Sequence, residues 1–282
     1  MADKIRTFHL GSAIVSIINV GNIRLKLAKT LNVPEIEWRP HYGEIFEQAF
    51  IFPSQCVHIA LSGASVLVDA GDFALSFPPD SPYFQPGYQP PPGLIDQLRE
   101  QGIHPRDITH LIITHAHFDH YSGVTTQHDG HYVPAFPNAH CFLGRADWEN
   151  PETQQALQDS DSRDSQTFGV LHRLGLLELV EGSRDLLPGV RIIAAPGESP
   201  GHQIVRVHSE GQTLYCLGDL YHHAVEVEQP EWMAQWANPH TTVASRHALA
   251  EAALAESALL IAAHMPVGRL ERSGPGVRWV TV

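Results

Sequence analysis

The sequence predicts an α/β protein in which two β-sheets pack together with helices on the outside. Short runs rich in Val, Ile and Leu occur in two batches along the chain, and helical segments follow each batch. Hydrophobic residues make up 43% of the chain and charged residues 17%, as in ordinary globular proteins. At 282 residues the chain is long enough to bury a large core, and no sharp boundary divides it. We therefore expect one domain over residues 1–282.

The strands of the first batch are bounded by Gly, Ser or Asp, and we expect them at residues 12–20, 56–61, 65–69, 108–114 and 139–143. Ser62-Gly63-Ala64 is typical of a hairpin turn between two of them. Residues 94–101 have an amphipathic pattern that ends at Gly102, a typical C-terminal cap, and predict a short helix. We expect further helices from about Gly123 and over residues 147–159.

The second batch of strands is expected at residues 190–194, 204–208, 213–217 and 259–263. Residues 243–257 are rich in Ala and predict a helix before the last of these strands. Trp232 and Trp236 are four residues apart, so on a helix they would share one face. We expect these two side chains to pack in the core.

Charge and hydropathy exclude several classes of partner. The net charge is −13 and no run of Lys or Arg occurs, which argues against nucleic acid or an anionic membrane as the main partner. The apolar stretch at residues 10–20 contains polar residues and is shorter than the about 18 residues that a membrane span requires. It also lacks a signal-peptide cleavage site, so we interpret it as a strand. The sequence predicts a soluble, cytoplasmic protein that acts on a small molecule.

The three cysteines, Cys56, Cys141 and Cys216, are widely separated and form no Cys-x-x-Cys pair. Neither a disulfide framework nor a thiolate zinc site is expected from this pattern. Each cysteine is instead predicted to pack as a small apolar residue in or near a strand.

Residues 72–92 form a long connection with seven Pro and five aromatic residues. Connections of this length without regular structure are usually functional or disordered, and the aromatic residues favour function. The loop is either a lid over the site or a packing or dimer surface, and as a dimer surface it would make the protein a homodimer. As a lid, it would bring Phe73, Tyr83 and Phe84 to the substrate.

The most informative segment is the run Thr-His-Ala-His-Phe-Asp-His at residues 114–120. His115 and His117 are two apart, so at the end of a strand both imidazoles leave the same face. Asp119 and His120 follow in the turn beyond that strand. Nitrogen and carboxylate donors without a thiolate suit Zn²⁺, Fe or Mn²⁺ in a catalytic site better than a structural zinc.

Other strand ends carry further candidate donors. His202 ends a Gly/Pro-rich turn just before a strand, and His264 follows the last apolar strand. Asp219 follows Gly218 at another strand end, and its carboxylate is a group that can bridge two cations. Asp69 also ends a strand, where it is placed to accept the outer N–H of a ligating His or simply to form a turn.

These pieces together resemble the metallo-β-lactamase-fold hydrolase superfamily over nearly the whole chain. The matching pieces are Asp69, residues 115–120, the Pro-Gly-x-x-x-Gly-His turn that ends at His202, Gly218-Asp219 and His264. The resemblance implies an αββα sandwich with two divalent metal ions at one edge, Zn²⁺ being expected and Fe, Mn or Co being alternatives. It implies that one ion is held by His115, His117 and His202. It implies that the other is held by Asp119, His120 and His264, with Asp219 as the bridge.

Within the superfamily the sequence resembles the lactonase and esterase branch, and its motif layout is close to that of acyl-homoserine lactonases. Those enzymes carry a Tyr three residues after the bridging Asp, where this chain has His222, with Tyr221 one residue earlier. Either Tyr221 or His222 is a candidate to polarise a carbonyl or to protonate a leaving group, the alternative being a surface turn. The departure weakens the case for homoserine lactones as substrates.

The predicted mechanism is attack by a metal-bridging hydroxide on an ester or lactone carbonyl. Two cations that share a water lower its pKa, and Asp119 and Asp219 would hold them. Asp219 or His222 would return the proton, and Phe118 is a candidate to line the substrate pocket. Hydrolysis of a phosphotriester, phosphodiester or thioester at the same site is an alternative. An alternative of another class is a protein with this fold that binds a ligand without turnover.

Overall fold

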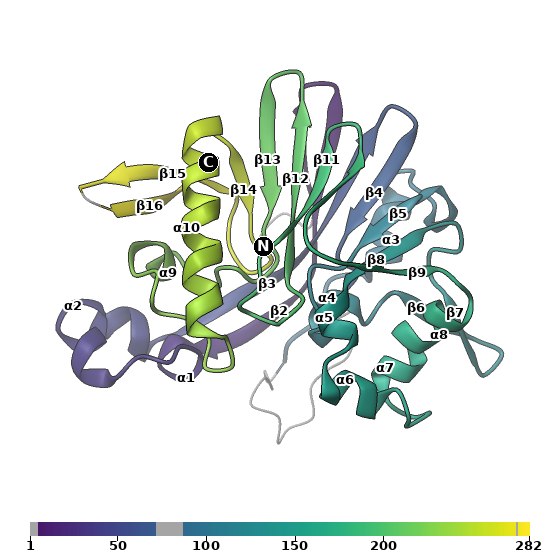
Figure 1. The fold of residues 1–282 in the computed structure, drawn as a ribbon, viewed down its shortest axis with the longest axis horizontal. Helices are drawn as coiled ribbons and strands as arrows, with labels where there is room; N and C mark the ends of the chain where they lie inside the picture. The colour runs from purple at the N-terminus through teal and green to yellow at the C-terminus, as the bar shows by residue number, and fades with distance from the viewer. Residues whose placement is uncertain (1–4, 72–86, 275) are drawn as a thin grey trace.

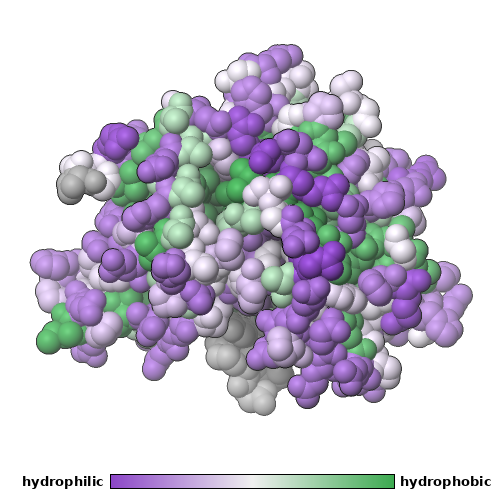
Figure 2. Space-filling model, viewed as in Figure 1, coloured by the Kyte–Doolittle hydropathy of each residue, from purple (hydrophilic) through white to green (hydrophobic). Residues whose placement is uncertain are grey.

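The computed structural model describes residues 5–71, 87–274 and 276–282. Two seven-stranded mixed sheets lie one against the other, and helices flank them (Figure 1). The predicted sandwich of two sheets with helices outside is confirmed. In the face that Figure 2 shows, hydrophilic side chains cover most of the surface, and a column of mildly hydrophobic residues runs over α10 (Pro239–Glu256).

The first sheet has the order β1-β2-β3-β4-β5-β8-β9, and its strands are Ile5–Leu10, Ala13–Lys26, Ala49–Leu61, Ala64–Val68, His110–Ile112, His140–Gly144 and Leu177–Val180. The first four strands are antiparallel and the last four are parallel, with β4 in both groups. Strands β2 and β3 pair over most of their length, with a bulge between Asn19 and Gly21. Both are far longer than the sequence predicted.

The second sheet has the order β10 to β16, and its strands are Arg184–Leu187, Val190–Ala194, Gln203–Ser209, Gln212–Cys216, Leu259–Ile261, Gly268–Ser273 and Gly276–Thr281. Among the described pairs of this second sheet, β13 and β14 are parallel and the others are antiparallel. The helix α10 connects these two strands, as a parallel crossover requires. The C-terminal hairpin β15–β16 extends the sheet beyond the strands that the sequence predicted.

The remaining elements are short apart from α2 and α10. A separate hairpin consists of β6 (Thr125–His128) and β7 (His131–Pro134). The helices before α10 are α1 (Leu27–Thr30), α2 (Glu35–Glu47), α3 (Leu94–Glu100), α4 (Phe118–Tyr121), α5 (Arg145–Trp148), α6 (Pro151–Ala156), α7 (Arg163–Gln166), α8 (Phe168–Arg173) and α9 (Val225–Glu228), with a 3₁₀ turn η1 (Pro105–Asp107).

Alternation along the strands divides the core into layers. In β4, Val66 and Val68 are buried in the core between the two sheets, where Val205 of β12 also lies. Leu67, between them in the chain, faces the other way and packs with Leu98 of α3 in the outer core. Successive side chains of the strand therefore point to opposite faces, and both faces are buried. The hydrophobic effect of this burial stabilises the packing of the two sheets.

Two helix predictions need correction. The helix expected from Gly123 is wrong, because Asp129 and Gly130 take φ values of 48° and 79° and form the tight turn of the β6–β7 hairpin. The helix expected over residues 147–159 is two short helices, α5 and α6. The break falls at Asn150-Pro151, where the Asn150 side chain accepts the N–H of Glu152 and caps the second helix.

Cys56, Cys141 and Cys216 are buried in β3, β8 and β13, which confirms that they pack as apolar residues. Of the aromatic residues in the Pro-rich connection, Phe73, Tyr83 and Phe84 lie outside the described residues. Tyr88 is described, and its hydroxyl accepts the N–H of Asn22 on β2 at 2.7 Å. Within the described ranges, the structure contains no helix long and apolar enough to cross a membrane.

Candidate metal centre

The predicted ligand run lies between β5 and α4 at one edge of the first sheet. His117 is the N-cap of α4, so His115 precedes this helix while Asp119 and His120 lie on it. The neighbouring end of β4 packs tightly on α4. A Cβ atom on Gly71 would lie only 1.9 Å from the carbonyl oxygen of Asp119, so glycine is required there.

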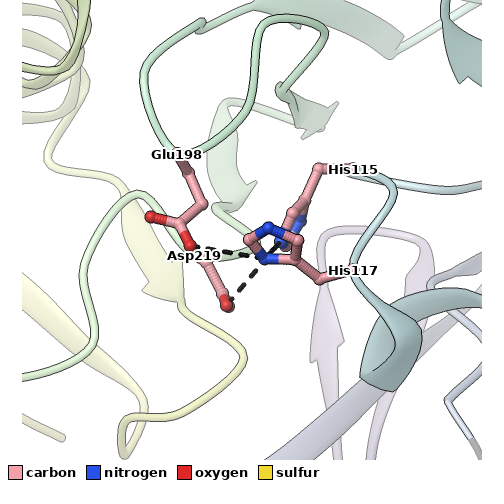
Figure 3. A group of neighbouring side chains, drawn as sticks. All are labelled: His115, His117, Glu198 and Asp219. Carbon is pink, nitrogen blue, oxygen red and sulfur yellow. Dashed lines mark hydrogen bonds and ion pairs between the residues drawn. The ribbon is translucent and has the colours of Figure 1, made fainter. Parts of the chain in front are cut away.

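Two groups of His and carboxylate side chains gather at this edge, and in each group the donor atoms lie within 4.8 Å of one another. The first group comprises His115, His117, Glu198 and Asp219, whose side chains point toward one another (Figure 3). The second comprises Asp119, His120, Asp219 and His264. Asp219 belongs to both groups, and the second sheet supplies it and His264 from the ends of β13 and β14.

The Asp219 carboxylate lies at the centre of the two groups. Its Oδ2 atom is 3.2 Å from Nε2 of His264, 3.3 Å from Nε2 of His120 and 3.8 Å from Nε2 of His115. Asp119 contributes a second carboxylate, with Oδ2 at 3.3 Å from Nε2 of His264. The structure thus brings together residues that are up to 149 positions apart in the sequence, as the separation of His115 and His264 shows.

The outer ring nitrogens of these histidines are held by the protein. Nδ1 of His120 is 2.9 Å from Oδ2 of Asp69, the residue that the sequence placed behind a ligating His. Nδ1 of His264 lies 2.7 Å from the carbonyl oxygen of Pro53 in β3. Such bonds fix the tautomer and direct the Nε2 lone pair toward the cluster, as in metal sites generally.

His202, the third predicted ligand of the first ion, lies beside the first group. Its ring centroid is 5.1 Å from that of His115, and its Nδ1 lies 3.0 Å from the carbonyl oxygen of Ala195. Its Nε2 accepts the backbone N–H of Asp219 at 3.2 Å. His202 thus lies beside the first group without being one of its four members, and its role as a ligand of the first ion stays a prediction.

The donors fit a divalent metal ion. Nε2 of His120 and Oδ1 of Asp219 are buried and have no hydrogen-bond partner among the described residues. Leaving a buried polar atom unpaired costs about 1–3 kcal/mol, so such atoms normally have a partner that completes their bonding. Imidazole and carboxylate donors are the ligands that Zn²⁺, Fe and Mn²⁺ accept.

The ionisation of the cluster also suits a cation. Burial, together with the charges of His120 and His117, lowers the pKa of His115 well below its ordinary value, and the neutral ring is the form that binds metal. Burial opposes ionisation of Asp219, but His264 and His120 hold its pKa well below the usual range. Burial likewise opposes protonation of His264, yet Asp219 and Asp119 raise its pKa to about 10. The carboxylates thus give the cluster a strong affinity for positive charge.

Replacing Asp69 by Asn is expected to lower metal affinity by about 10–100-fold, the usual effect of removing a group that orients a ligand. The Asp69 carboxylate accepts the N–H and hydroxyl of Thr114 at 2.7 and 2.9 Å besides orienting His120. An amide cannot accept from all three groups. Titration of the metal-free protein with Zn²⁺ against a competing chelator measures the change. The exposed variant Asp107→Asn is the control, and equal affinities in both variants would contradict the role of Asp69.

A cavity of about 300 Å³ opens beside the cluster. Its polar lining contains His117, Asp119, Asp219, His222 and His264, and its apolar lining contains Ile23, Leu25, Phe52, Ala116, Phe118 and Trp236. The sequence-based prediction for Trp236 is wrong: it lies in no helix, is 52% exposed and lines this cavity. Trp232 does pack in the core, edge-on to Phe46 of α2.

The side chains of Tyr221 and His222 lie in different surroundings. Tyr221 is buried among apolar residues, and the guanidinium of Arg246 lies 4.8 Å from its ring centre, so it does not face the cavity. His222 lines the cavity, with Nε2 at 3.5 Å from Oδ2 of Asp219. Glu226 fixes the backbone here by accepting the N–H groups of His222 and His223 at 2.5 and 2.8 Å.

The sequence-based reasoning missed two acidic residues. Glu198 lies inside the turn that ends at His202, and the reasoning used this turn only for its His. Asp147 accepts the N–H of Ala116 at 2.9 Å, the hydroxyl of Ser199 at 2.8 Å and the N–H of Gly201 at 2.6 Å. It thereby connects the ligand run to that turn. For Glu198 a signal was present: an acidic residue between Pro-Gly and Pro-Gly at a strand edge.

Comparison with known families agrees with this geometry. The model of the metallo-beta-lactamase superfamily matches residues 51–264, and the chain belongs to this superfamily. The chain is similar to an N-acyl homoserine lactonase of Bacillus cereus, with 29% identity over 125 residues, and to one of Bacillus sp., with 30% identity over 130 residues. These matches cover 44% and 45% of this chain and 42% and 45% of the relatives, so the matched region spans less than half of their length.

Solved structures show the same fold over the whole chain. The hydrolase AbOPH of the beta-lactamase superfamily matches with a TM-score of 0.79 and 16% identity, covering 100% of this chain and 98% of its own. The structure of AidC, described as a dizinc quorum-quenching lactonase in complex with a product, matches with a TM-score of 0.76 and 21% identity, covering 99% and 97%. At these identities the likeness establishes the fold.

Proposed function

We propose that the protein is a metal-dependent hydrolase that opens a lactone or cleaves an ester with an apolar acyl group. The observation that carries this proposal is the position of the donor clusters in the wall of a cavity whose remaining lining is largely apolar. Pockets for small molecules typically combine an apolar lining with a few convergent polar groups. The similarity to N-acyl homoserine lactonases supports an acylated lactone as the first substrate class to test.

The proposed ion positions are the two groups that share Asp219. Divalent cations bound there would supply an activated water and polarise a carbonyl oxygen. The residues themselves orient the substrate: Ile23 and Leu25 of β2 and Phe52 of β3 form an apolar wall on which an acyl chain packs. This contact directs the carbonyl group toward the polar wall of the cavity.

His222 is the proposed proton carrier of the site. It lines the cavity, and neither of its ring nitrogens has a hydrogen-bond partner among the described residues. Its Nε2 is therefore available to donate to a carbonyl or leaving-group oxygen, the role that the sequence left open between His222 and Tyr221. Glu226 and the backbone bonds that it accepts hold His222 in place.

The described lining of the cavity contains the carboxylates of Asp119 and Asp219 but no Lys or Arg. Divalent cations bound at the two donor groups would be the largest charges in the cavity and would pair an anionic substrate as well as polarise a neutral one. Hydrolysis of a phosphodiester therefore stays an alternative to hydrolysis of a lactone or ester.

A panel of substrates tests the proposal. The metal-loaded protein is assayed with N-acyl homoserine lactones of several chain lengths, simple lactones, aryl esters, thioesters and phosphotriesters. We expect the highest kcat/KM for an acylated lactone or ester, loss of that activity with a chelator, and recovery on return of the metal. Two bound ions without turnover of any substrate would favour the ligand-binding alternative. Higher activity on a phosphotriester would reassign the reaction.

Replacing Leu25 by Trp is expected to shorten the acyl chain that the enzyme accepts. The larger ring would fill part of the apolar cavity, and each excluded methylene is worth about 1–3 kcal/mol of transition-state binding. We expect kcat/KM for long-chain substrates to fall at least about tenfold relative to short-chain substrates. Ile14→Trp is the matched control because Ile14 lies exposed on the same strand, outside the cavity lining. An unchanged dependence of kcat/KM on acyl-chain length would contradict the proposed contact between the acyl chain and this apolar wall.

A further inference from the structure

We propose that Trp236 determines which leaving alcohol the enzyme accepts, because its indole ring packs against the alcohol part of the substrate. This inference rests on the proposed hydrolase function and names the substrate class of the same cavity more closely. The class is a lactone, or an ester whose alcohol carries an aromatic ring, in preference to an ester of a small linear alcohol.

Trp236 lies at the polar end of the cavity. Its ring centroid is 6.1 Å from that of His117 and 6.2 Å from that of His222, and the ring planes meet at 79° and 89°. His222 is the proposed proton donor, so the leaving-group oxygen must come within hydrogen-bond reach of its Nε2. The atoms attached to that oxygen therefore lie beside the indole ring, whereas the acyl wall belongs to β2 and β3.

The indole ring keeps much of its apolar surface open. Trp236 is 52% exposed and lines the cavity, whereas Trp38 is 5% exposed and stacks on Phe46 in the core. Tryptophan usually buries most of its surface, so the open ring beside the donor groups is available to a ligand. A flat or cyclic group that covers the ring gains the free energy of apolar burial, and a small linear alcohol covers less of it.

A buried carboxylate fixes the direction of the indole ring. The indole N–H donates to Oε1 of Glu198, which is buried in the turn between β11 and β12. A hydrogen bond to a charged acceptor is stronger than one between neutral groups. A side chain that is held in one orientation before binding loses less conformational freedom when the substrate binds. Glu198 is thus a positioning residue for Trp236.

The backbone on both sides of Trp236 is fixed as well. The N–H of Gln235 donates to the carbonyl oxygen of Thr30 at 3.0 Å, and the N–H of Asn238 donates to that of Gly197 at 2.8 Å. The second bond joins the segment of Trp236 to the turn that carries its carboxylate partner. The indole N–H and its acceptor are therefore positioned together, and the fold presents the ring to the cavity.

Two esters with the same acyl chain test the proposal on the metal-loaded, full-length chain. Benzyl hexanoate and ethyl hexanoate differ only in the alcohol, and the two leaving alcohols are similar in basicity. In Trp236→Ala we expect kcat/KM to fall at least about tenfold for benzyl hexanoate and for N-hexanoyl homoserine lactone, mainly through KM, and less than about threefold for ethyl hexanoate. Trp236→Phe keeps a ring but has no N–H for Glu198, and it should fall between Trp236→Ala and wild type.

Tyr132→Ala is the matched control, because Tyr132 is a 38% exposed aromatic residue of β7 outside the described lining of the cavity. This variant should resemble wild type on all three substrates. Metal content and circular dichroism are measured on every variant. Both should stay unchanged in Trp236→Ala, since Trp236 belongs to neither donor group.

Three results would overturn the assignment of Trp236 while the hydrolase function stands. They are unchanged kinetics in Trp236→Ala, an equal fall of kcat/KM for all three substrates, and a loss of bound metal that accompanies the fall. A Trp236→Phe variant as selective as wild type would overturn the positioning role of Glu198. A wild-type chain that hydrolyses no ester or lactone would overturn the proposed function and this inference with it.

Discussion

Replacing Asp219 by Asn is expected to abolish tight binding of at least one metal ion and to lower kcat/KM by about 10³-fold or more. Asp219 is the residue that the two donor groups share, with Oδ2 within 3.3 Å of Nε2 in both His120 and His264. The amide has the same shape but carries no charge, so it cannot serve two cations as a carboxylate does. Loss of several kcal/mol of charge stabilisation corresponds to a rate change of this size.

Metal analysis and kinetics on the same samples check this prediction. Asp185→Asn is the control, because Asp185 is an exposed carboxylate that pairs with Arg191 away from the cluster. Circular dichroism of both variants shows whether the fold is retained. Asp185→Asn should keep the metal content and activity of wild type. Full metal content and full activity in Asp219→Asn would contradict the proposed bridge. Equal losses of activity in the two variants would contradict it as well.

Replacing Arg246 by Met is expected to lower the free energy of unfolding by about 3–5 kcal/mol, the usual cost of breaking a buried ion pair by removing one partner. Arg246 is only 2% exposed, and its Nη2 donates to Oε1 of Glu226 at 2.7 Å. Its other guanidinium nitrogens donate to the carbonyl oxygens of Leu220, Pro230 and Trp232. Methionine would leave Glu226 and three carbonyl groups without their donor. Urea denaturation measures the loss.

Arg278→Met is the matched control, since Arg278 pairs with Glu271 on the surface, where the two side chains are 55% and 51% exposed. An exposed pair is worth about 0–1 kcal/mol, so this variant should unfold close to wild type. The pH dependence offers a second test. Burial opposes ionisation of Glu226, but Arg246 and His222 lower its pKa from 4.5 to about 2. Its contribution to stability is present above pH 4.5 and is lost as the pH falls toward 2, and Arg246→Met should weaken this dependence.

The sequence could predict much of the site because its donors stand at strand ends. His115 and Asp219 each come shortly after a run of apolar residues, and such runs identify strands without knowledge of their neighbours. The layered fold followed from the same runs. Asp69 was predicted behind a ligand for a related reason: a polar residue directly after a buried strand needs a partner at the sheet edge.

The parts of the site and of the fold that the sequence did not predict depend on contacts between distant segments or have a weak sequence pattern. Glu198 acquires its position only through the packing of its turn against α10 and Asp147, neither of which is near it in sequence. The hairpin β15–β16 and the edge strand β1 are half-exposed and mix polar with apolar residues, so their pattern is weak. Trp236 was misplaced because a spacing of four residues indicates a shared face only if a helix forms, and none does there.

The three hydrogen bonds accepted by Asp147 also bear on the order of folding. Their donors lie 31, 52 and 54 residues away along the chain, so all three require loops to close before they can form. The ligand run comes from one sheet and Asp219 from the other. A partly folded chain with a single sheet in place therefore holds only part of the donor set. The full set of donors comes together only when both sheets are in place, so tight binding of a metal ion would be coupled to the complete fold.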